Sequence, residues 1–547
     1  MTITSENDGS IYYDYLNSFP RLDDFFHYPP RLIEVLKQRI DDLQADYSFN
    51  RQALVSALRQ RNGSLGAPSR TMDFIQELEQ EETMVLVSGQ QAGVMTGPLY
   101  TVYKALATIK LVERLRTEEG LQVVPLFWVA SEDHDLQEVA RIKFMTRENR
   151  LEELGLFSLP QPSPAVGHLP LGGALVLNEL EEMLDAFEAG VIATEFTPEI
   201  MELLRETLAS SSDLVEWFSR LMLALFGDRG LIIFDPLQAE LQQLLKPFWQ
   251  RTLADYQEIN DAFQQQSRNL KERGYTLQLE KERDQLPFFI SLPERRALFV
   301  TKGGFQTRGG EFHFSRQELE DLLEKAPWLF TSSAHTRPLL QSYLLPVLAS
   351  FGGPGEVAYH AQLGGIFDTQ GVKMPPLLPR PGLTLVEERI SSYLDKYCFE
   401  VSDVLAGRLQ DLLQERLEEL SGVDIGSCFE ELNQQWSRQY LELIEELGTI
   451  DQQLIPLGKK NLERIREELS YLEEKAHQFN RRNHDLIRRQ FKKVELSLYP
   501  GGRLQERSYN VFQYLNKYGF QFLDYLSRQL PSAGEHHFLR CGGDCFD

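Results

Sequence analysis

Two stretches of the chain share one pattern, in which a short apolar run leads into a glycine-rich loop and a Gly-Pro pair then opens a helix. The first is MVLVSGQQAGVMTGPLYTVYK (84–104) and the second is LASFGGPGEVAYHAQ (348–362). Proline suits the first turn of a helix, where its missing N–H costs no hydrogen bond. The free amides of such a turn and the positive end of the helix dipole attract anions. Two such helix starts predict a site for an anionic ligand.

The first stretch lies within an expected strand–helix–strand unit. Residues 84–87 are a short apolar run, and residues 98–115 carry apolar side chains at every third or fourth position, as a helix does. Residues 123–130 (VVPLFWVA) are continuously apolar, which suits a strand buried on both faces. A unit of this kind predicts an α/β fold with a parallel sheet and a right-handed crossover.

The chain of 547 residues is longer than one hydrophobic core usually supports, so we expect roughly two to four domains. We assign residues 1–382 to the α/β core. The core sheet is expected to resume at LIIF (231–234), and a helix is expected over 338–349. The proline-rich run MPPLLPRP (374–381) cannot be helical and is interpreted as the exit from the core.

Two insertions and a tail complete the expected organisation. The insertions lie at about 140–230 and about 240–330. Within the second, β-like alternation over 275–314 is broken by Gly-Gly pairs and predicts a small hairpin subdomain. Residues 501–547 are expected to form a C-terminal helical segment and tail.

A heptad pattern predicts an α-helical coiled-coil domain over 383–500. Pro456 and Gly458 are turn residues between two arms and favour an antiparallel hairpin. The seam could instead pair with a second chain, so a homodimer and a helical domain packed on itself both remain open. The seam positions are Leu432, Trp436, Tyr440, Leu443, Leu447 and Leu454, then Leu462, Ile465, Leu469, Leu472, Ala476 and Phe479.

The net charge of −25 disfavours binding to nucleic acid, which needs clustered Lys and Arg. The basic segment at 481–493 is interpreted as a solvated helix face. No segment approaches the ~20 apolar residues of a membrane span, and the N-terminus lacks the features of a signal peptide. We therefore expect a cytoplasmic protein without nucleic-acid or membrane partners.

The four cysteines do not make a disulfide framework in a chain of this length, which favours a reducing cytosol. His536, His537, Cys541 and Cys545 could be interpreted as a metal clip. Their spacing matches no standard zinc motif, so we predict no metal site there.

The first glycine-rich loop combines backbone freedom with polar side chains. It has neither the GxGxxG of dinucleotide folds nor the GxxxxGK[S/T] of the P-loop. Because helical side chains lean toward the N-terminus of their helix, Lys104 can reach back toward an anion near the loop. Open α/β sheets bind ligands at the carboxyl ends of their strands, so we favour a site over a structural turn. The candidates for binding substrate or nucleotide are Ser88, Gly89, Gln90, Gln91, Gly93, Thr96, Gly97 and Tyr100, with Lys104 as a catalytic candidate.

An ionisable cluster, Glu132-Asp133-His134-Asp135, follows the second expected strand. Four such groups after a buried strand are costly unless they are paired or solvated in a cleft. They could act as general acid and base, bind an amine or hold a divalent cation. Asp135 also fits the first position of a capping box with Glu138, which would explain Asp135 alone. We therefore take all four as catalytic candidates.

The second glycine-rich stretch and its flanks supply further binding candidates. Glu356 is favoured near a helix start by the dipole in any case. Arg337 and Arg380 could hold a carboxylate or phosphate through two parallel hydrogen bonds, or form surface ion pairs. The candidates from this part of the chain are Arg337, Gly352, Gly353, Glu356, Tyr359, Gln362 and Arg380.

Four segments resemble the BshC family: GQQAGVMTGPLYTVYK, FWVASEDHDLQEV, RPLLQSYLLPVLASFGGPGEVAYHAQL and LYPGGRLQER (498–507). The resemblance spans nearly the whole chain. It implies a Rossmann-like core similar to class I nucleotidyltransferases, with connecting insertions, and a coiled coil that promotes dimerisation. It also implies a cysteine ligase of bacillithiol biosynthesis, which adds L-cysteine to the amine of glucosaminyl-malate and forms an amide.

Chemistry suggests a mechanism for the implied reaction. A free carboxylate must be activated before it forms an amide in water, and ATP is the usual source. Adenylation would give cysteinyl-AMP, which the sugar amine attacks. In this hypothesis the first loop and the helix after Pro98 hold phosphates, Lys104 stabilises developing charge, and an arginine holds malate. The cluster of Glu132 to His134 would orient or deprotonate the amine.

One departure leaves the use of ATP and its mode of binding open. Class I adenylating enzymes carry a HIGH-type histidine motif and a KMSKS-type loop, and this sequence has neither. Two other functions are also considered: a nucleotidyltransferase acting on another small acid, and a coiled-coil interaction protein with a degenerate α/β core. All site assignments assume that Gln90, His134 and Glu356 lie around one cavity.

Overall fold

The computed structural model describes residues 10–30, 32–133, 139–157, 174–292, 294–420, 422, 424–531 and 533–542. The described residues form two compact units. The first contains those up to Leu385 and those from Gln505 onward, and the second is Val386–Leu504. The C-terminal segment therefore belongs to the same unit as the α/β core, a return that the sequence pattern does not reveal.

A five-stranded parallel sheet forms the centre of the first unit, which confirms the expected α/β fold class. The strand order is β12-β11-β1-β2-β5, with β1 in the middle. β1 and β2 pair without a break from Met84 opposite Val123 to Gln90 opposite Val129. The strands are β1 (Met84–Gln90), β2 (Val123–Val129), β5 (Ile232–Phe234), β11 (Val347–Gly352) and β12 (Leu377–Pro379).

Both faces of this sheet are buried, which explains why its strands are continuously apolar. Val85 and Val87 of β1 face one hydrophobic core, and Met84 and Leu86 face the other, as the two-residue period of a strand requires. The first core includes α3 (Arg51–Ser64) and α10 (Ala239–Ala254), and the second includes α5 (Leu99–Glu118) and α9 (Leu214–Phe226). Each buried aliphatic side chain contributes about 1.5–3 kcal/mol, so the strand ends are held firmly.

Two segments differ from the sequence-based expectation. α13 (Arg337–Leu344) ends short of residue 349, because β11 begins at Val347. The proline-rich run at 374–381 supplies β12, the edge strand of the sheet, and is more than an exit from the core. An edge strand needs hydrogen bonds on one side only, so prolines are tolerated there. Ser350 N donates to Pro376 O at 3.0 Å.

The insertions build two further layers around the sheet. The first contains an antiparallel pair and helices: β3 (Arg141–Met145), β4 (Leu151–Gly155), α7 (Ala174–Gly190), α8 (Thr197–Ala209) and α9. The second contains α10, α11 (Tyr256–Glu272), α12 (Arg316–Lys325) and an antiparallel sheet of order β10-β6-β7-β8-β9. Its strands are β6 (Gln285–Ser291), β7 (Arg295–Thr301), β8 (Gly304–Thr307), β9 (His313–Phe314) and β10 (Phe330–Ser332).

The remaining elements of the first unit lie at its two chain ends and after β11. Leu515, Phe522 and Leu526 of the C-terminal segment share a hydrophobic core with α5. β13 pairs with β14. The elements are α1 (Ile11–Asn17), α2 (Leu32–Asp46), α4 (Ser69–Glu77), α14 (Pro354–His360), α15 (Gly364–Thr369), β13 (Gly382–Glu387), α21 (Gln505–Ser508), α22 (Phe512–Tyr518), α23 (Gln521–Gln529) and β14 (His536–Cys541).

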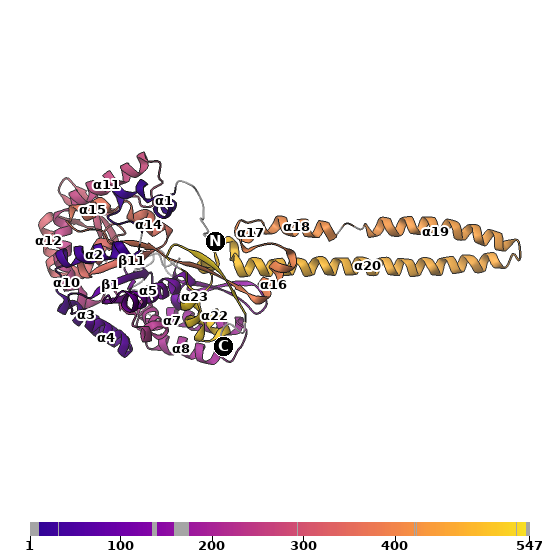
Figure 1. Ribbon diagram of the computed structural model, residues 1–547, viewed down its shortest axis with the longest axis horizontal. Coiled ribbons are helices and arrows are strands. Elements are labelled where there is room, and N and C mark those ends of the chain that lie inside the picture. Colours follow the sequence, from indigo (N-terminus) through magenta and orange to yellow (C-terminus); the bar gives the residue numbers. More distant parts are fainter. Residues whose placement is uncertain are drawn as a thin grey trace. The chain divides into compact units, whose positions relative to one another are not determined.

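The second unit is helical and contains the expected coiled-coil region. Its helices are α16 (Glu388–Tyr397), α17 (Val401–Leu405), α18 (Leu409–Leu420), α19 (Ile425–Gly448) and α20 (Leu454–Leu498). α19 and α20 run side by side as the arms of a hairpin (Figure 1). Among the described residues, no helix combines the length and the apolar character needed to span a bilayer.

The turn of the hairpin is not at Pro456 and Gly458, as the sequence suggested, but at residues 449–453. Pro456 lies in the first turn of α20, where no backbone N–H is needed. Gly458 also lies within α20, and a Cβ there would be 2.6 Å from Ile444 Cγ1. The glycine therefore serves the close approach of the two helices and does not form their turn.

Gly458→Ala is expected to destabilise the hairpin by about 1–3 kcal/mol, because the added methyl group would overlap Ile444 in a packed interface. Thermal unfolding of the full chain followed by circular dichroism measures the effect. Gly426→Ala is the control, because the atom nearest to a Cβ there is Asp424 Oδ1 at 3.5 Å, an ordinary contact. Wild-type stability of Gly458→Ala would contradict the close approach.

Candidate active site

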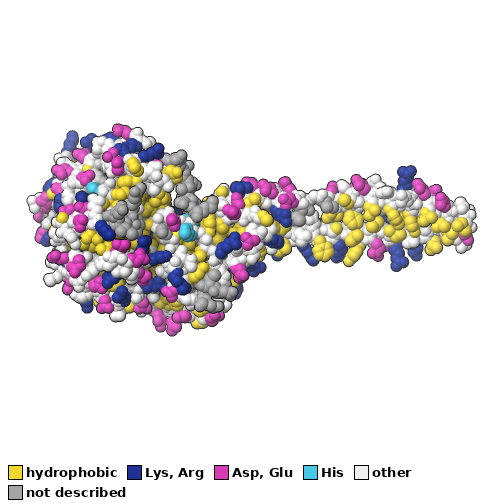
Figure 2. Space-filling view, in the orientation of Figure 1, with side chains coloured by type: hydrophobic (Ala, Val, Ile, Leu, Met, Phe, Trp, Pro, Cys, Tyr) yellow, Lys and Arg dark blue, Asp and Glu magenta, His cyan; other side chains and the backbone are white. Residues whose placement is uncertain are grey.

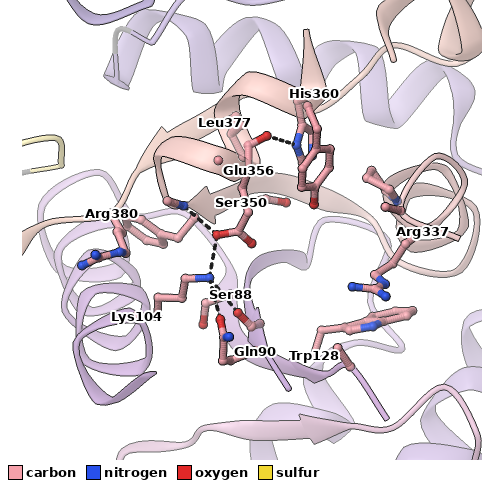
Figure 3. A pocket seen from close by; sticks show the side chains of 18 of the residues that line it. Ser88, Gln90, Lys104, Trp128, Arg337, Ser350, Glu356, His360, Leu377 and Arg380 are labelled. Atoms are coloured by element: carbon pink, nitrogen blue, oxygen red, sulfur yellow. Dashed lines mark hydrogen bonds and ion pairs between the residues drawn. The ribbon is translucent and has the colours of Figure 1, made fainter. Parts of the chain in front are cut away.

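A cavity of about 400 Å³ lies at the carboxyl ends of β1, β2 and β11 (Figure 3). Ligands bind at this edge in open parallel sheets. The two glycine-containing stretches of the sequence meet there. The lining residues are Val87, Ser88, Gly89, Gln90, Gln91, Tyr100, Lys104, Trp128, Ala130, Asp133, Gln278, Leu279, Ala334, Arg337, Pro338, Gln341, Ser350, Phe351, Gly353, Pro354, Gly355, Glu356, Tyr359, His360, Leu377, Arg380 and Arg507.

Lys104 of α5 is buried and joins the two stretches through an ion pair with the partly exposed Glu356 (Figure 3). Its Nζ lies 2.7 Å from Glu356 Oε2, 2.9 Å from Gly89 O and 3.2 Å from Gln90 Oε1. An ammonium group has three protons, and these three acceptors use all of them. Burial lowers the pKa of Lys104, which Glu356 only partly offsets. Lys104 does reach back to the first loop, but the anion that it binds is the protein's own carboxylate.

Glu356 presents one oxygen to the protein and the other to the cavity. Oε2 accepts from Lys104 Nζ and, at 2.6 Å, from Gly353 N, in the capping box that begins α14. Oε1 has no hydrogen-bond partner in the described part of the chain, and the carboxylate points into the cavity (Figure 3). Burial would raise the pKa of Glu356, but Lys104 and the Gly353 N–H outweigh it and hold the pKa below its ordinary value. Glu356 is therefore ionised at neutral pH and offers an acceptor to a ligand.

Asp133 and Arg337 form a second ion pair. Arg337 lies across the cavity from Lys104 (Figure 3). Arg337 Nη2 lies 2.5 Å from Asp133 Oδ1, and Gln91 Nε2 donates to Asp133 Oδ2 at 3.3 Å. Burial opposes the charge on Asp133, but Arg337 and Arg295 lower its pKa below the ordinary value. Burial also opposes the charge on Arg337, and Asp133 raises its pKa in turn. Both groups are ionised and hold each other in place.

Glu132 does not line the cavity, which removes the basis for its expected catalytic role. The residue is 2% exposed, and both its oxygens accept hydrogen bonds from Ser332, with the backbone N at 2.8 Å and the hydroxyl group on the other oxygen. Burial raises the pKa of Glu132. A buried carboxylate needs donors, and Ser332 supplies them, so Glu132 ties the end of β2 to β10. His134 and Asp135 lie outside the described residues.

The second half of the first glycine loop is packed away from the cavity. Gly93, Thr96 and Gly97 do not line it. A Cβ on Gly93 would lie 2.8 Å from Gly97 Cα, so this pair permits a close approach of the backbone to itself. Leu99 N, the first amide of α5, donates to Tyr509 O at 2.8 Å. The structure therefore gives no support to the phosphate site expected at this helix start.

Asn510 of the C-terminal segment holds this loop in a strained conformation. Met95 and Thr96 have φ values of 49° and 68°, which side-chain-bearing residues rarely adopt. Asn510 Nδ2 donates to Met95 O at 2.6 Å and to Gly97 O at 2.8 Å. These two bonds satisfy carbonyl groups that the unusual backbone would otherwise bury without partners.

A third ion pair, between Arg380 and Glu506, is almost fully buried beside the cavity. Arg380 Nη2 lies 2.5 Å from Glu506 Oε1, and Leu383 N donates to Glu506 Oε2 at 3.2 Å. Burial opposes ionisation of Glu506, but Arg380 outweighs it and lowers the pKa of Glu506. The Arg380 guanidinium carbon lies 5.3 Å from the ring centroid of Tyr100, whose hydroxyl oxygen accepts from Gln90 Nε2 at 3.1 Å.

The structure gathers many of the sequence-predicted site residues around one cavity. Those that line it are Ser88, Gly89, Gln90, Gln91, Tyr100, Lys104, Asp133, Arg337, Gly353, Glu356, Tyr359 and Arg380. Those that do not are Gly93, Thr96, Gly97, Glu132, Gly352 and Gln362. Gln362 does not line the cavity, and its side-chain amide is hydrogen-bonded to other residues. The amide accepts from Gln278 N and Leu279 N and donates to Ser267 Oγ and Leu279 O. Gln90 and Glu356 share the cavity as assumed; His134 is not described.

The sequence argument missed Trp128, Ser350, His360 and Arg507, which also line the cavity. His360 lies one helical turn after Glu356, a spacing that could have identified it. Its Nδ1 lies 2.7 Å from Glu356 O, and because a carbonyl group only accepts, Nδ1 carries the proton. Burial lowers the pKa of His360, so the ring is neutral at neutral pH.

A metal site is not evident among the described residues. No group of three or more His, Cys, Asp or Glu side chains in that part of the chain is arranged to hold an ion. Glu132 and Asp133, considered as ligands for a divalent cation, are occupied by Ser332 and Arg337. Of the C-terminal His/Cys set, His536 Nε2 lies 2.8 Å from Thr384 Oγ1, and Cys545 lies outside the described residues.

Comparison with known proteins gives consistent matches over the whole chain. Residues 1–381 match the family model "Bacillithiol biosynthesis BshC, N-terminal Rossmann-like domain", and residues 383–540 match "Bacillithiol biosynthesis BshC, C-terminal coiled-coil domain". A protein of Heliobacterium modesticaldum is 35% identical over 484 residues, 88% of this chain and 87% of its own length. One of Bacillus cytotoxicus is 32% identical over 530 residues, 96% of this chain and 97% of its own length. Both are named "Putative cysteine ligase BshC". These matches confirm the resemblance, the Rossmann-like core and the coiled coil.

Glu506→Gln is expected to cost about 3 kcal/mol of folding free energy at neutral pH, because it leaves the buried Arg380 without a counter-charge. The pKa of Glu506 in the folded chain lies below its unfolded value, so its contribution is present above the ordinary carboxyl pKa of about 4.3. That contribution is lost as pH falls through the lower folded pKa. The difference in unfolding free energy between wild type and variant should therefore become smaller as the pH falls.

Denaturant unfolding at a series of pH values between about 3 and 7 measures this difference. Glu181→Gln, at an exposed position of α7, is the matched control and should leave stability within about 0.5 kcal/mol. A difference between wild type and Glu506→Gln that stays constant with pH would show that the ion pair does not stabilise the fold.

Proposed function

The chain belongs to the BshC family of bacillithiol biosynthesis, and on that premise we propose that it is a ligase joining the carboxyl group of L-cysteine to the amine of glucosaminyl-malate. The new bond is an amide between the cysteine carbonyl carbon and the sugar nitrogen. The supporting observation is the cavity at the carboxyl ends of β1, β2 and β11, which is lined by an ionised carboxylate, a neutral imidazole and three arginines. The reaction is expected in the cytosol, where the thiol product stays reduced.

We propose that ATP activates the cysteine carboxylate as cysteinyl-AMP, with release of pyrophosphate. The sugar amine then attacks the carbonyl carbon, AMP leaves with the carboxyl oxygen, and the nitrogen loses a proton. The phosphate site expected from the sequence at the start of α5 has no support in the geometry, because Leu99 N is occupied by Tyr509 O. The side-chain donors that line the cavity are better suited to bind anionic groups than the start of α5.

Glu356 is proposed to orient the attacking amine. Its Oε1 is directed into the cavity while Oε2 is fixed by Lys104 and Gly353, so the acceptor is preorganised before substrate binds. Because its pKa is held low, Glu356 stays charged and is suited to hold an ammonium or amine group. His360, neutral and with its proton on Nδ1, is proposed to take up the proton released from the nitrogen.

The exposed apolar side chains of α19 and α20 support a further proposal, that two copies of the chain pair through the coiled coil. Figure 2 shows hydrophobic side chains in a band along this hairpin. Part of the seam lies within the hairpin, as Leu462 does at 4% exposure. Other predicted seam residues remain exposed: Leu432, Leu443, Leu447, Leu472 and Phe479. A hairpin saturated by its own packing would bury these side chains.

The ligase proposal is tested by incubating the purified chain with ATP, L-cysteine and glucosaminyl-malate and detecting the thiol product by mass spectrometry. Release of pyrophosphate, measured over a panel of small acids, separates this function from adenylation of another acid. Absence of product with any nucleotide or divalent cation, together with normal bacillithiol in a strain that lacks the gene, would overturn the proposal.

Glu356→Gln is expected to lower kcat/KM by about 100-fold, because the neutral amide removes the negative acceptor and leaves Lys104 buried without a counter-charge. Steady-state kinetics with a parallel melting curve checks this. Glu77→Gln is the matched control: it breaks the half-buried pair with Arg116, which lies outside the cavity, and should leave kcat/KM unchanged. Wild-type kinetics of Glu356→Gln would remove it from the proposed mechanism.

Leu472→Glu is expected to convert a dimer to a monomer, because it places a charge in the proposed seam at a position that is 56% exposed in one chain. Light scattering after size-exclusion chromatography gives the mass. Gln435→Glu, at an exposed polar position of α19, controls for the added charge. A monomeric wild-type chain, or a dimeric Leu472→Glu variant, would refute pairing through this seam.

A further inference from the structure

We propose that Arg507 binds an anionic group of the ligand, a carboxylate or a phosphate, on the side of the cavity that holds Lys104. This inference rests on the proposed function and deepens it, since it gives a binding role to Arg507, which ends the segment LYPGGRLQER (498–507) but was not among the site residues expected from the sequence.

The positive charges around Lys104 outnumber the carboxylates that pair with them. Arg380 and Arg507 are both close enough to act on Lys104 and lower its pKa. Glu356 is the ion-pair partner of Lys104, and Glu506 is the partner of Arg380. Arg507 lines the cavity and has no ion-pair or hydrogen-bond partner among the residues that the structure describes. Lys104, Arg380 and Arg507 thus carry three positive charges, and the two carboxylates neutralise only two of them. The positive charge that is not neutralised is that of Arg507.

The backbone around Arg507 is held in place by hydrogen bonds of the adjacent residues. Its neighbours are anchored on both sides: Gln505 bonds Leu385 through its amide, and Glu506 accepts from Arg380. Three residues further on, Asn510 donates to the loop after β1. Arg507 itself is exposed while Gln505, Glu506 and Asn510 are buried. A fixed backbone reduces the entropy lost when the side chain orders on a ligand.

The protein as a whole is strongly acidic. With a net charge of −25, the surface repels small anions at long range. Glucosaminyl-malate and ATP are both anionic, so the cavity must supply positive charge that attracts them. Of the arginines that line it, Arg337 and Arg380 are already neutralised by Asp133 and Glu506. Arg507 remains to meet a charge brought by the ligand.

The test is steady-state kinetics of Arg507→Ala and Arg507→Lys. Arg507→Ala should raise KM for one anionic substrate about 10- to 100-fold and change kcat less than about threefold, since the residue binds substrate and does not take part in the chemistry. Arg507→Lys should recover part of the loss, because it keeps the charge without the planar fork. Arg503→Ala, which removes an exposed arginine outside the cavity, is the control and should match wild type.

Two substrate arms distinguish the source of the anion. If Arg507 binds the malate carboxylates, KM for glucosaminyl-malate rises while KM for methyl glucosaminide, which carries no carboxylate, stays unchanged. If it binds nucleotide phosphate, KM for ATP rises instead. Unchanged KM values for both anionic substrates would overturn the inference while the ligase activity stands.

A binding arm keeps the inference testable if the wild-type chain makes no product. Thermal shift with L-malate, inorganic phosphate and ATP is measured on wild type, Arg507→Ala and Arg503→Ala. A shift with at least one of these anions that Arg507→Ala reduces and Arg503→Ala keeps would support the anion site even though the proposed function had failed. Equal shifts in all three proteins, or no shift in wild type, would overturn it.

Discussion

The ion pair between the buried Lys104 and the partly exposed Glu356 joins the ends of β1 and β11 across 252 residues of sequence. Removing one partner would leave the other charge unpaired and would cost several kcal/mol of folding free energy, so the fold needs both residues. The pair therefore keeps the starts of α5 and α14 together. It also occupies Glu356 Oε2, and this leaves Oε1 directed at the cavity. One electrostatic requirement of the fold thus creates the acceptor on which the proposed reaction depends.

The same rule governs the other charges of the site. Arg337 is paired with Asp133 and Arg380 with Glu506, and Glu132 is satisfied by Ser332. These pairs fix side chains and helix ends before any ligand arrives, which is how a site becomes preorganised. Their cost is that Lys104, Arg337 and Arg380, the three cations that the sequence proposed for the site, are already paired with carboxylates of the protein.

The site also depends on residues that follow the helical hairpin. The chain leaves the first unit after Leu385 and returns at Gln505, and the amide of Gln505 closes that junction with Leu385 N at 2.8 Å and Leu385 O at 3.0 Å. The returning segment supplies Glu506 to Arg380 and Asn510 to the loop after β1. A domain boundary placed at the start of the hairpin therefore separates Glu506 and Asn510 from the residues of the first unit that they contact.

The sequence by itself determined the parallel sheet, the paired long helices and the strand ends where the cavity lies. Apolar periodicity, glycine and proline act over a few residues, so a linear pattern is enough to predict them. Partner choice was decided only by the tertiary structure: Lys104 with Glu356, Glu132 with Ser332, Gln362 with the backbone of Leu279. Coulombic and hydrogen-bond energies depend on the distances between groups that lie far apart in the sequence. For the same reason, only the tertiary structure shows that Arg507 is exposed beside cations that are already paired.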